Sequence, residues 1–216
     1  MFTGIIEATG KLSAIRRQGA DLSISISSDN LDFSDVKLGD SIASNGVCLT
    51  VTALGKHSFD ADVSSETLAH TLFGQYQTGQ VINLEKAMLP TTRMGGHIVS
   101  GHVDGVTRVV KIEQSGRAWQ IWLARPKSLA HYIAHKGSVT IDGISLTVNE
   151  LTNDAFRLTI VPHTAANTSI AQLKPGTAVH LEVDIIARYL ERLLNKDNAA
   201  SSGGVSMALL AQRGFL

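Results

Sequence analysis

The sequence predicts an all-β protein of two small antiparallel β-barrels in tandem, followed by one C-terminal α-helix. Three observations lead to this fold class. The chain repeats itself at an offset of 97 residues, apolar and polar residues alternate along many short segments, and an apolar stripe of helical period follows the second repeat.

The repeat is visible when the 216-residue chain is slid against itself by 97 positions. The segment GVCLTV at 46–51 then matches GISLTV at 143–148, and 18 positions over residues 1–88 are identical without a gap. Chance at ordinary composition would give roughly five. We therefore expect four parts, with barrels at 1–96 and 97–183, a helix at 184–195, and a linker with a tail at 196–216.

Strands are predicted where apolar and polar residues alternate with a period of two. Glycine-containing turns separate these segments, and Asn45-Gly46 and Asp142-Gly143 supply the positive φ that tight hairpins require. Each half then holds about six short antiparallel strands, and closing them into a barrel leaves few exposed edges. The clearest strand segments are LSISIS (22–27), VCLTVT (47–52), ISLTVN (144–149), FRLTI (156–160) and VHLEVD (179–184).

The predicted helix runs from about Asp184 to Leu194, and its large apolar side chains recur with helical spacing. Residues 195–206 are polar and contain glycine, which indicates a flexible linker. Residues 207–216 form a short apolar tail that either docks or stays disordered. The apolar stripe of the helix consists of Ile185, Ile186, Tyr189, Leu190, Leu193 and Leu194.

The composition argues against several classes of protein. Lysine plus arginine and aspartate plus glutamate each number 19, so the formal net charge is zero, unlike nucleic-acid binders and polybasic membrane surfaces. Only 18% of the residues are charged, which favours self-association. Cys48 is the only cysteine, and the sequence shows neither a signal-type N-terminus nor an apolar run of membrane-spanning length. We therefore expect a soluble cytoplasmic protein.

Two equivalent strands carry rows of short polar side chains. Cys48 and Thr50 share one face of the first strand, and Ser145 and Thr147 occupy the equivalent face of the second. An ordinary solvated face is one interpretation, but such faces usually carry lysine, glutamate or arginine. Short side chains instead leave room for a flat ligand or another subunit. Covalent catalysis by Cys48 is disfavoured, because the equivalent position holds Ser145.

Histidines mark places where the two copies differ in acid–base character. His97 and His102 lie five residues apart without a cysteine pair or a carboxylate cluster, so we predict no metal site. His102 takes the place of Ile5, and His163 takes the place of Glu66. Each is alternatively an ordinary satisfied polar group. Glu66 and His163 also follow strands at the start of short helices, where backbone N–H groups suit an anionic or carbonyl-rich ligand.

Five segments together resemble the riboflavin synthase family of the α type. The resemblance covers about residues 1–195 and implies two six-stranded Greek-key barrels and a helix that assembles a homotrimer. It implies the dismutation of two 6,7-dimethyl-8-ribityllumazine molecules, without cofactor or metal, between the first barrel of one subunit and the second barrel of a neighbour. Association with lumazine synthase is a further expectation. The five segments are MFTGII, SNGVCLTV, GGHIVSGHVDG, IDGISLTVN and IVPHT.

The same resemblance implies the site residues. The candidates for proton transfer, hydration control or ring polarisation are Ser145, His102, Cys48 and Glu66, among which the sequence does not divide these roles. The substrate-binding residues expected from the N-terminal segment and the first barrel are Phe2, Thr3, Gly4, Ile5, Ile6, Cys48, Leu49, Thr50, Asp62, Val63, Ser64, Ser65, Glu66 and Thr67. Those expected at the second barrel are Gly101, His102, Val103, Lys136, Ser145, Leu146, Thr147, Thr159, Ile160, Val161, Pro162, His163 and Thr164.

Two other functions compete with that of an enzyme. A non-catalytic lumazine or flavin carrier, such as the optical antenna proteins of the same superfamily, resembles this repeat but keeps one good site, in the first barrel. Here the second barrel retains Ser145, Thr147, Lys136 and His102, which favours the enzyme. A structural barrel that assembles through its helix would explain the apolar stripe but not the two matched polar rows.

Overall fold

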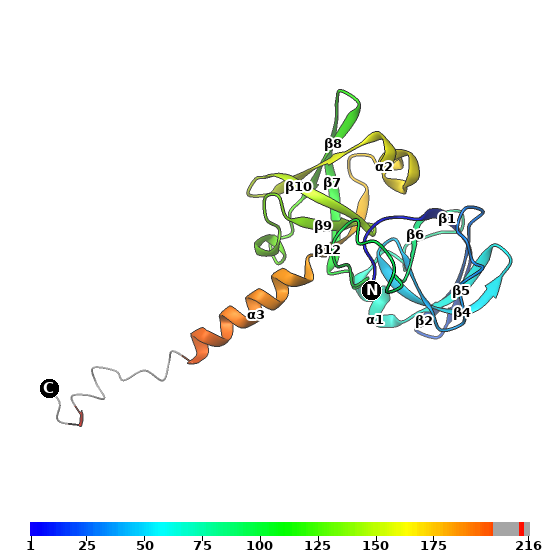
Figure 1. Cartoon of the computed structure of the whole chain (residues 1–216), viewed down its shortest axis with the longest axis horizontal. Coiled ribbons are helices and arrows are strands. Elements are labelled where there is room, and N and C mark those ends of the chain that lie inside the picture. The colour runs from blue at the N-terminus through cyan, green and yellow to red at the C-terminus, as the bar shows by residue number, and fades with distance from the viewer. Residues whose placement is uncertain (201–211, 214–216) are drawn as a thin grey trace. The chain divides into compact units, whose positions relative to one another are not determined.

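The computed structural model describes residues 1–200 and 212–213, so most of the expected linker and tail lies outside the described residues. Residues 1–184 form one unit that contains two closed antiparallel barrels of six strands each, and the helix that follows belongs to a second unit (Figure 1). The predicted fold class is confirmed.

Barrel 1 closes in the strand order β1-β2-β5-β4-β3-β6. Alternation builds it, since β2 reads DLSISIS and buries every second residue. A short helix, α1 (Ser65–His70), joins β5 to β6. The strands are β1 (Ala8–Gln18), β2 (Asp21–Ser27), β3 (Ser41–Ser44), β4 (Val47–Gly55), β5 (Ser58–Val63) and β6 (Val81–Lys86).

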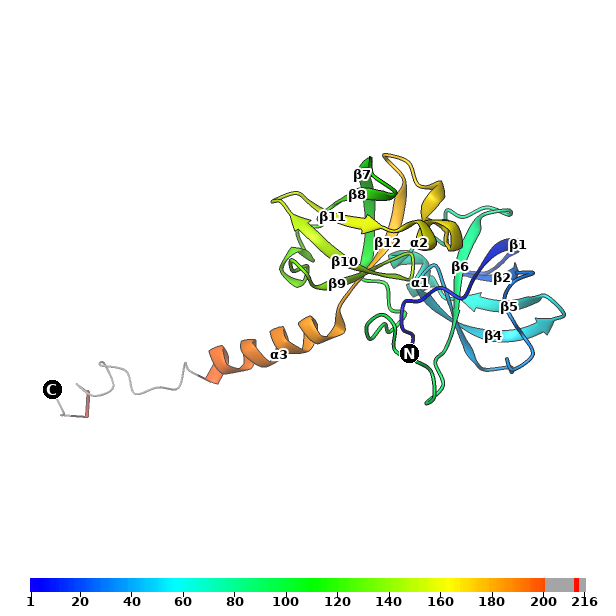
Figure 2. The same cartoon turned by 45° about the horizontal axis from the view of Figure 1, so that its top comes forward.

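Barrel 2 repeats this cyclic order with β7-β8-β11-β10-β9-β12. The α2 helix (Pro162–Asn167) stands where α1 stands in barrel 1, and two 3-10 turns, η1 (Ala130–Tyr132) and η2 (Ser169–Gln172), are added. Figure 2 shows β4 of barrel 1 and β10 of barrel 2, the strands that carry the polar rows, together with their pairing partners β5 and β11. The strands are β7 (Gly105–Ser115), β8 (Ala118–Ala124), β9 (Ser138–Ile141), β10 (Ile144–Leu151), β11 (Ala155–Ile160) and β12 (Ala178–Val183).

The C-terminal helix α3 (Ile185–Ala200) begins directly after barrel 2. It continues past the expected end at Leu194 because residues 195–200 contain neither glycine nor proline. Among the described residues, none of the helices combines the length and the apolar character needed to cross a membrane.

Each barrel has its own apolar core, but the arm that precedes each barrel packs on the other one. We call residues 1–7 the first arm and residues 98–104 the second arm. Ile6 of the first arm packs against the core of barrel 2, and Val103 of the second arm packs against the core of barrel 1. Ile6 and Val103 are 97 residues apart, so the exchange is reciprocal.

The two copies meet along an approximate twofold axis. Phe2 N–H donates to Val99 O at 2.8 Å, and Val99 N–H donates to Phe2 O at 3.1 Å. Gly46 and Gly143, which are also equivalent, face each other with φ of 80° and 81°. A Cβ on Gly46 would lie 2.7 Å from Gly143 N, so both the backbone conformation and the close approach require glycine here.

Candidate functional site

Site 1, the polar face of barrel 1, is built from three segments. They are Cys48–Thr50 of β4, Asp62–Thr67 at the end of β5 and the start of α1, and Gly101–Val103 of the second arm. Cys48 N–H donates to Gly101 O at 2.9 Å, which joins the arm to the strand. The pairing of β4 with β5 sets the second segment beside the first.

Site 2, the polar face of barrel 2, repeats this arrangement. Its segments are Ser145–Thr147 of β10, Thr159–Thr164 from β11 into α2, and Gly4–Ile6 of the first arm. Ser145 N–H donates to Gly4 O at 2.8 Å. Lys136 lies beside β10, where its backbone N–H donates to Val148 O at 2.8 Å. The structure therefore brings the expected segments together twice, but with the arms exchanged: Gly4–Ile6, expected at the first barrel, lie at site 2, and Gly101–Val103 with His102, expected at the second barrel, lie at site 1.

Glycine allows each arm to lie directly on the polar row. A Cβ on Gly4 would stand 2.6 Å from the Cβ of Ser145, and a Cβ on Gly101 would stand 2.7 Å from the Cβ of Cys48. Both glycines have positive φ, 76° and 79°. Any side chain at either position would push the arm away from the strand.

Buried carboxyl groups hold the arms in place. Glu85 on β6 accepts from Thr3 N–H and Thr3 Oγ1–H, both at 2.7 Å, and from Gly4 N–H at 2.9 Å. Glu182 on β12 accepts from Ser100 N–H and Oγ–H, both at 2.7 Å, and from Gly101 N–H at 3.1 Å. Burial raises the pKa of both carboxyl groups, to about 7 for Glu182, although the bonds from the arm oppose the shift.

Several expected binding residues have side chains that face the interior. Leu49 and Val63 belong to the core of barrel 1, and Ile160 belongs to the core of barrel 2. Phe2 is fully buried between the barrels in a cluster with Ala43 and Val99. These positions shape the faces through the backbone and through packing.

The side chains that remain exposed differ between the two faces. Thr50, Asp62 and Glu66 are exposed at site 1, together with His102 of the second arm. The Glu66 carboxylate lies 3.1 Å from His70 Nε2 on the same helix. Site 2 exposes Thr147, Lys136 and His163, with Ile5 of the first arm. The acid–base difference seen in the sequence thus lies on the surface.

The two short helices also begin differently. Ser64 caps α1, because its Oγ accepts from Thr67 N–H at 3.2 Å, and Asp21 accepts from Ser65 N–H at 2.7 Å. Helix α2 has Val161 at its N-cap without a side-chain bond, and Pro162 follows. Two of the N–H groups expected to suit a ligand at the helix start of site 1 are therefore already bound by protein side chains.

His97 is a site residue that the sequence analysis did not connect to the polar row. Its Nδ1 lies 2.7 Å from Ser145 Oγ, and its buried Nε2 has no hydrogen-bond partner within the described residues. Burial lowers the pKa of His97, and the charge of Asp184 opposes the shift. A neutral imidazole paired with a hydroxyl can accept or pass a proton near neutral pH.

One signal for His97 was present in the sequence. Gly95 and Gly96 directly precede it, and a Cβ on Gly96 would collide with Thr3 O and stand 2.8 Å from the Cβ of Ser145. A glycine pair indicates close backbone approach, but it does not name the partner. The partner follows only from the exchange of arms.

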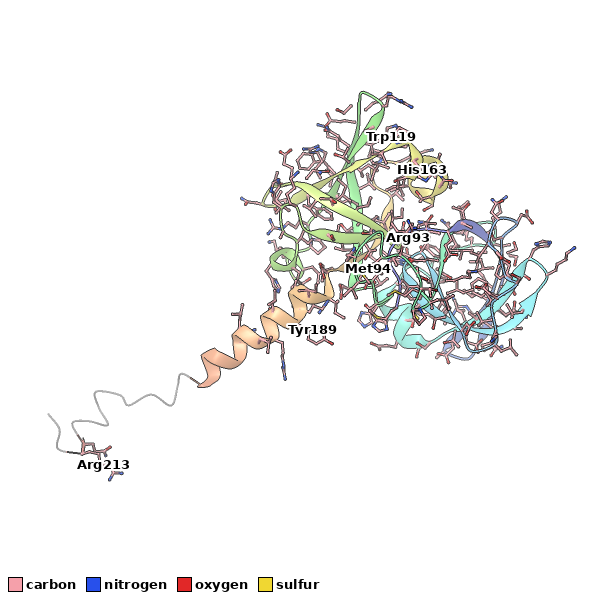
Figure 3. The ribbon with its side chains drawn as sticks, in the orientation of Figure 1. Arg93, Met94, Trp119, His163, Tyr189 and Arg213 are labelled. Atoms are coloured by element: carbon pink, nitrogen blue, oxygen red, sulfur yellow. The ribbon has the colours of Figure 1, made fainter. Side chains whose placement is uncertain are left out.

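Two cavities lie beside the first arm and site 2. One of about 660 Å³ runs along β3, the end of β6 and the loop to Gly95, and it shares Thr3 and Ile5 with the first arm. Another of about 310 Å³ adjoins site 2 and is lined by Trp119, Ile160 and Pro162. Figure 3 labels Arg93 and Met94 of that loop, and Trp119 and His163 of barrel 2. Neither of these two cavities is lined by Cys48, Thr50, Ser145 or Thr147, and the exposure of Thr50 and Thr147 makes the two polar rows open faces.

The donor set gives no indication of a metal. Within the described residues, histidine, cysteine, aspartate and glutamate side chains do not gather in threes around a common point.

Comparison with known proteins agrees with the duplicated architecture. The lumazine binding domain family matches residues 3–87 and again residues 100–184. The fold and the paired faces thus define a tandem lumazine-binding-domain protein. Over their full lengths, this chain and the riboflavin synthase of Photobacterium phosphoreum are 56% identical. The riboflavin synthases of Actinobacillus pleuropneumoniae and Bacillus subtilis are 44% and 40% identical to it, again with full coverage of both chains. The chain belongs to the riboflavin synthase family.

Solved structures share the fold. LumP complexed with riboflavin matches with a TM-score of 0.79 at 22% identity, covering 85% of this chain and 99% of that chain. LumP complexed with 6,7-dimethyl-8-(1'-D-ribityl) lumazine matches with a TM-score of 0.76 over the same shares. At this identity the likeness concerns the fold.

Proposed function

We propose that this chain catalyses the dismutation of two 6,7-dimethyl-8-ribityllumazine molecules. One molecule gives a four-carbon unit to the other, and the products are riboflavin and 5-amino-6-(D-ribitylamino)uracil. The observation that carries this function is 56% identity over the full chain to a relative named riboflavin synthase. The chain is accordingly an enzyme of the transferase class.

The duplicated architecture suits this reaction because both reactants are the same molecule. Sites 1 and 2 each offer a short polar row, a strand end and an arm to one ring. The 7-methyl group of the substrate is a carbon acid, since the heterocycle delocalises the anion, and no cofactor is needed as an electron sink. Holding the two rings in reacting geometry is worth about 7–11 kcal/mol, whereas acid–base assistance supplies about 3–5 kcal/mol. Positioning is therefore the larger contribution of the protein.

Proton transfer falls to groups that touch the open faces. Cys48 and Glu66 are the candidates at site 1, where His102 also lies, and Ser145 is the candidate at site 2. The 2.7 Å contact of His97 Nδ1 with Ser145 Oγ adds a partner at site 2, where Ser145 and His163 replace Cys48 and Glu66 of site 1. This asymmetry supports different treatment of two identical rings.

Assembly into a homotrimer completes the proposal. Tyr189, Leu190, Leu193 and Leu194 of α3 are all more than half exposed. Burying a large apolar side chain stabilises by about 1.5–3 kcal/mol, so packing three such helices together is favourable. The trimer places site 1 of one subunit against site 2 of a neighbour, which covers both open faces. The proposed location is the cytoplasm, and association with lumazine synthase is a further proposal.

The test of the function uses the full-length protein and 6,7-dimethyl-8-ribityllumazine as the sole substrate. Riboflavin is followed by fluorescence, and the aminopyrimidine product is separated by chromatography. One riboflavin per two lumazines consumed is the expected result. Lumazine that binds and stays unchanged would overturn the enzyme and identify a carrier.

The role of His97 is tested by His97→Gln, which keeps a polar side chain but removes the titrating ring. We expect kcat to fall about 100-fold, the lower range for acid–base assistance, with a smaller change in KM. His57→Gln is the control, because His57 is an exposed residue of the β4–β5 turn. Equal kcat in the two variants would remove His97 from the reaction.

A further inference from the structure

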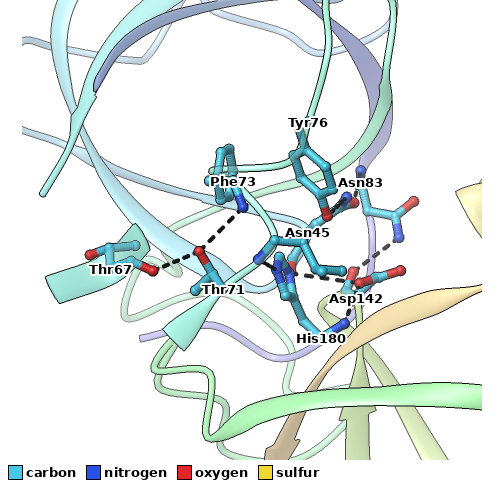
Figure 4. Close-up of polar contacts among 9 residues, drawn as sticks. Asn45, Thr67, Thr71, Phe73, Tyr76, Asn83, Asp142 and His180 are labelled. Atoms are coloured by element: carbon cyan, nitrogen blue, oxygen red, sulfur yellow. Dashed lines mark hydrogen bonds and ion pairs between the residues drawn. The ribbon is translucent and has the colours of Figure 1, made fainter. Parts of the chain in front are cut away.

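Buried polar side chains link the two barrels at two equivalent positions. Asn83 on β6 and His180 on β12 are 97 residues apart, and both are almost fully buried. Figure 4 shows both side chains in the network between the barrels, with Asn45 and Asp142. The proposed reaction has so far assigned neither residue a role.

Asn83 reaches from barrel 1 to two backbone groups of barrel 2. Its Nδ2 donates to Asp142 O at 2.9 Å, and its Oδ1 accepts from Ser169 N–H at 2.7 Å. The carboxamide of Asn83 therefore makes two hydrogen bonds to barrel 2, one as a donor through its nitrogen and one as an acceptor through its oxygen.

His180 makes the reciprocal pair of bonds from barrel 2 to barrel 1. Its Nδ1 donates to Asn45 O at 2.8 Å, and its Nε2 accepts from Leu72 N–H at 2.7 Å. Asn45 and Leu72 are the repeat equivalents of Asp142 and Ser169. The imidazole thus replaces the carboxamide atom for atom, provided that it is neutral and carries its proton on Nδ1.

The groups held by these bonds lead directly into the sites. Asn45 lies in the turn before β4, three residues ahead of Cys48. Leu72 lies two residues after the end of α1, the helix that contains Thr67 of site 1. A hydrogen bond from Thr71 Oγ1 to Thr67 O at 2.7 Å extends the hold to that helix. On the other side, Asp142 precedes Ser145 by three residues.

We propose that Asn83 and His180 are positioning residues: Asn83 of barrel 1 fixes the backbone of site 2, and His180 of barrel 2 fixes the backbone of site 1. Acid breaks the contact of His180 with site 1 but leaves the contact of Asn83 with site 2 intact. This inference rests on the proposed function for its effect on turnover. The geometry alone determines which backbone segments each residue supports.

The acid response follows from the two bonds of His180. A second proton on Nε2 would point at Leu72 N–H, so a donor would face a donor and the bond would be lost. Burial lowers the pKa of His180 to about 4 while both of its bonds to barrel 1 are formed, whereas an imidazole released to solvent titrates near 6.5. Between these two pH values, each pH unit downward makes the release of His180 from barrel 1 up to tenfold more favourable.

Three other titratable groups face this region. The Asp142 carboxylate lies 3.7 Å from His180 Nδ1 and accepts from His180 N–H at 2.8 Å, and burial raises its pKa to about 7. Tyr76 packs 5.9 Å from the imidazole between ring centroids, and burial raises its pKa. Glu182 is two residues further along β12 and is bound to the second arm. None of these three replaces the acceptor that Leu72 N–H requires.

The experiment compares full-length wild type with His180→Asn, His180→Ala and Asn83→Ala. Amide hydrogen exchange is followed in peptides covering 45–50 and 65–72 of barrel 1 and 142–147 and 162–169 of barrel 2. His180→Ala should speed exchange at least tenfold in the barrel 1 peptides, and Asn83→Ala should do so in the barrel 2 peptides. His180→Asn should restore protection, because Asn83 shows that a carboxamide fits.

Two further readouts test what a merely structural role would not change. Between pH 6.5 and 4.5, exchange in the barrel 1 peptides of wild type should rise relative to His180→Asn by up to tenfold per pH unit. At pH 7.5, kcat should fall at least tenfold in His180→Ala with a smaller change in KM, and His180→Asn should recover it to within about threefold.

The outcomes separate the two proposals. Wild type that forms no riboflavin would overturn the proposed function, while the exchange patterns would still judge the positioning role. Identical pH dependence of exchange in wild type and His180→Asn would overturn the acid-sensitive hold. Exchange that rises equally in both barrels for each alanine variant would overturn the reciprocal arrangement, and His180→Asn keeps that test open if an alanine variant does not fold.

Discussion

Removing the carboxyl group that holds one arm should disable one site and leave the other intact. Glu85→Ala takes away the acceptor of three hydrogen bonds to Thr3 and Gly4, and Glu182→Ala takes away the acceptor of three bonds to Ser100 and Gly101. At about 0.5–1.5 kcal/mol net for each bond, the arm loses about 1.5–4.5 kcal/mol of attachment. A central value of about 3 kcal/mol corresponds to roughly a 100-fold shift toward the detached arm.

Glutamine variants supply an intermediate step. The amide oxygen can still accept from the two donors that share one carboxylate oxygen, but the amide NH₂ faces the third donor. Burial raises the pKa of Glu182 to about 7, and the hydrogen bonds from Ser100 and Gly101 oppose this shift because they favour the charged carboxylate. We expect arm attachment to decrease from wild type to glutamine to alanine, with the glutamine variants closer to wild type.

The assay combines hydrogen exchange with turnover. Glu85→Ala should raise exchange in residues 2–6 while residues 99–103 stay protected, and Glu182→Ala should do the reverse. Both should lower kcat by about 10–2000-fold, which is the range that 1.5–4.5 kcal/mol gives. Exchange that rises in both arms for either variant, or full kcat with a detached arm, would refute the conclusion that each arm completes a separate site.

Four further results are expected. Cys48→Ser should keep kcat within about tenfold while Cys48→Val loses more; complete inactivation by serine would instead indicate a thiolate nucleophile. Ser145→Ala should lower kcat by about 10–100-fold, as loss of a bond to developing charge costs about 1.5–3 kcal/mol, and an unchanged kcat would exclude this role. Leu190→Glu with Leu194→Glu should sediment as a monomer with β-type circular dichroism and lose riboflavin formation, whereas a monomer with normal turnover would place the reaction within one chain. Because burial lowers the pKa of His180 to about 4, its stabilising contribution is present above pH 6.5 and is lost as the pH falls. Between pH 6.5 and 4, the unfolding free energy of wild type should drop relative to His180→Asn by up to about 1.4 kcal/mol per pH unit. Parallel curves of unfolding free energy against pH for the two proteins would contradict this.

The barrels could be predicted from the sequence because their signals are local and occur twice. Alternation at 22–27 and 47–52 gives the strands, Asn45-Gly46 gives a hairpin, and the match at an offset of 97 shows that the second half repeats the first. The segments of both sites follow from the same match and from the family resemblance. Strand order and closure then follow from packing one alternating set into a small core.

The exchange of arms could not be predicted, because a repeat shows that two segments are alike and not which barrel each one contacts. Ile6 would pack equally well, as far as sequence shows, against its own barrel or the other. Glu85 and Glu182 matched in the repeat, but glutamate is usually exposed, so burial against an arm had no signal. The contact of His97 with Ser145 depends on that exchange and was missed for the same reason.

The two copies share residues that fix the backbone of the sites and differ in side chains that would face a ligand. The glycines and glutamates that fix the arms and the twofold contact are identical in both copies, as Gly4 is with Gly101, Gly46 with Gly143 and Glu85 with Glu182. On the open faces several equivalent residues differ: Cys48 stands against Ser145, Ile5 against His102 and Glu66 against His163. In the proposed reaction this shared frame would hold two identical rings in equivalent geometry, and the differing side chains would let one ring gain and the other lose a four-carbon unit. Exchanging one such pair, Ile5→His with His102→Ile, should therefore leave both arms protected from hydrogen exchange while kcat falls.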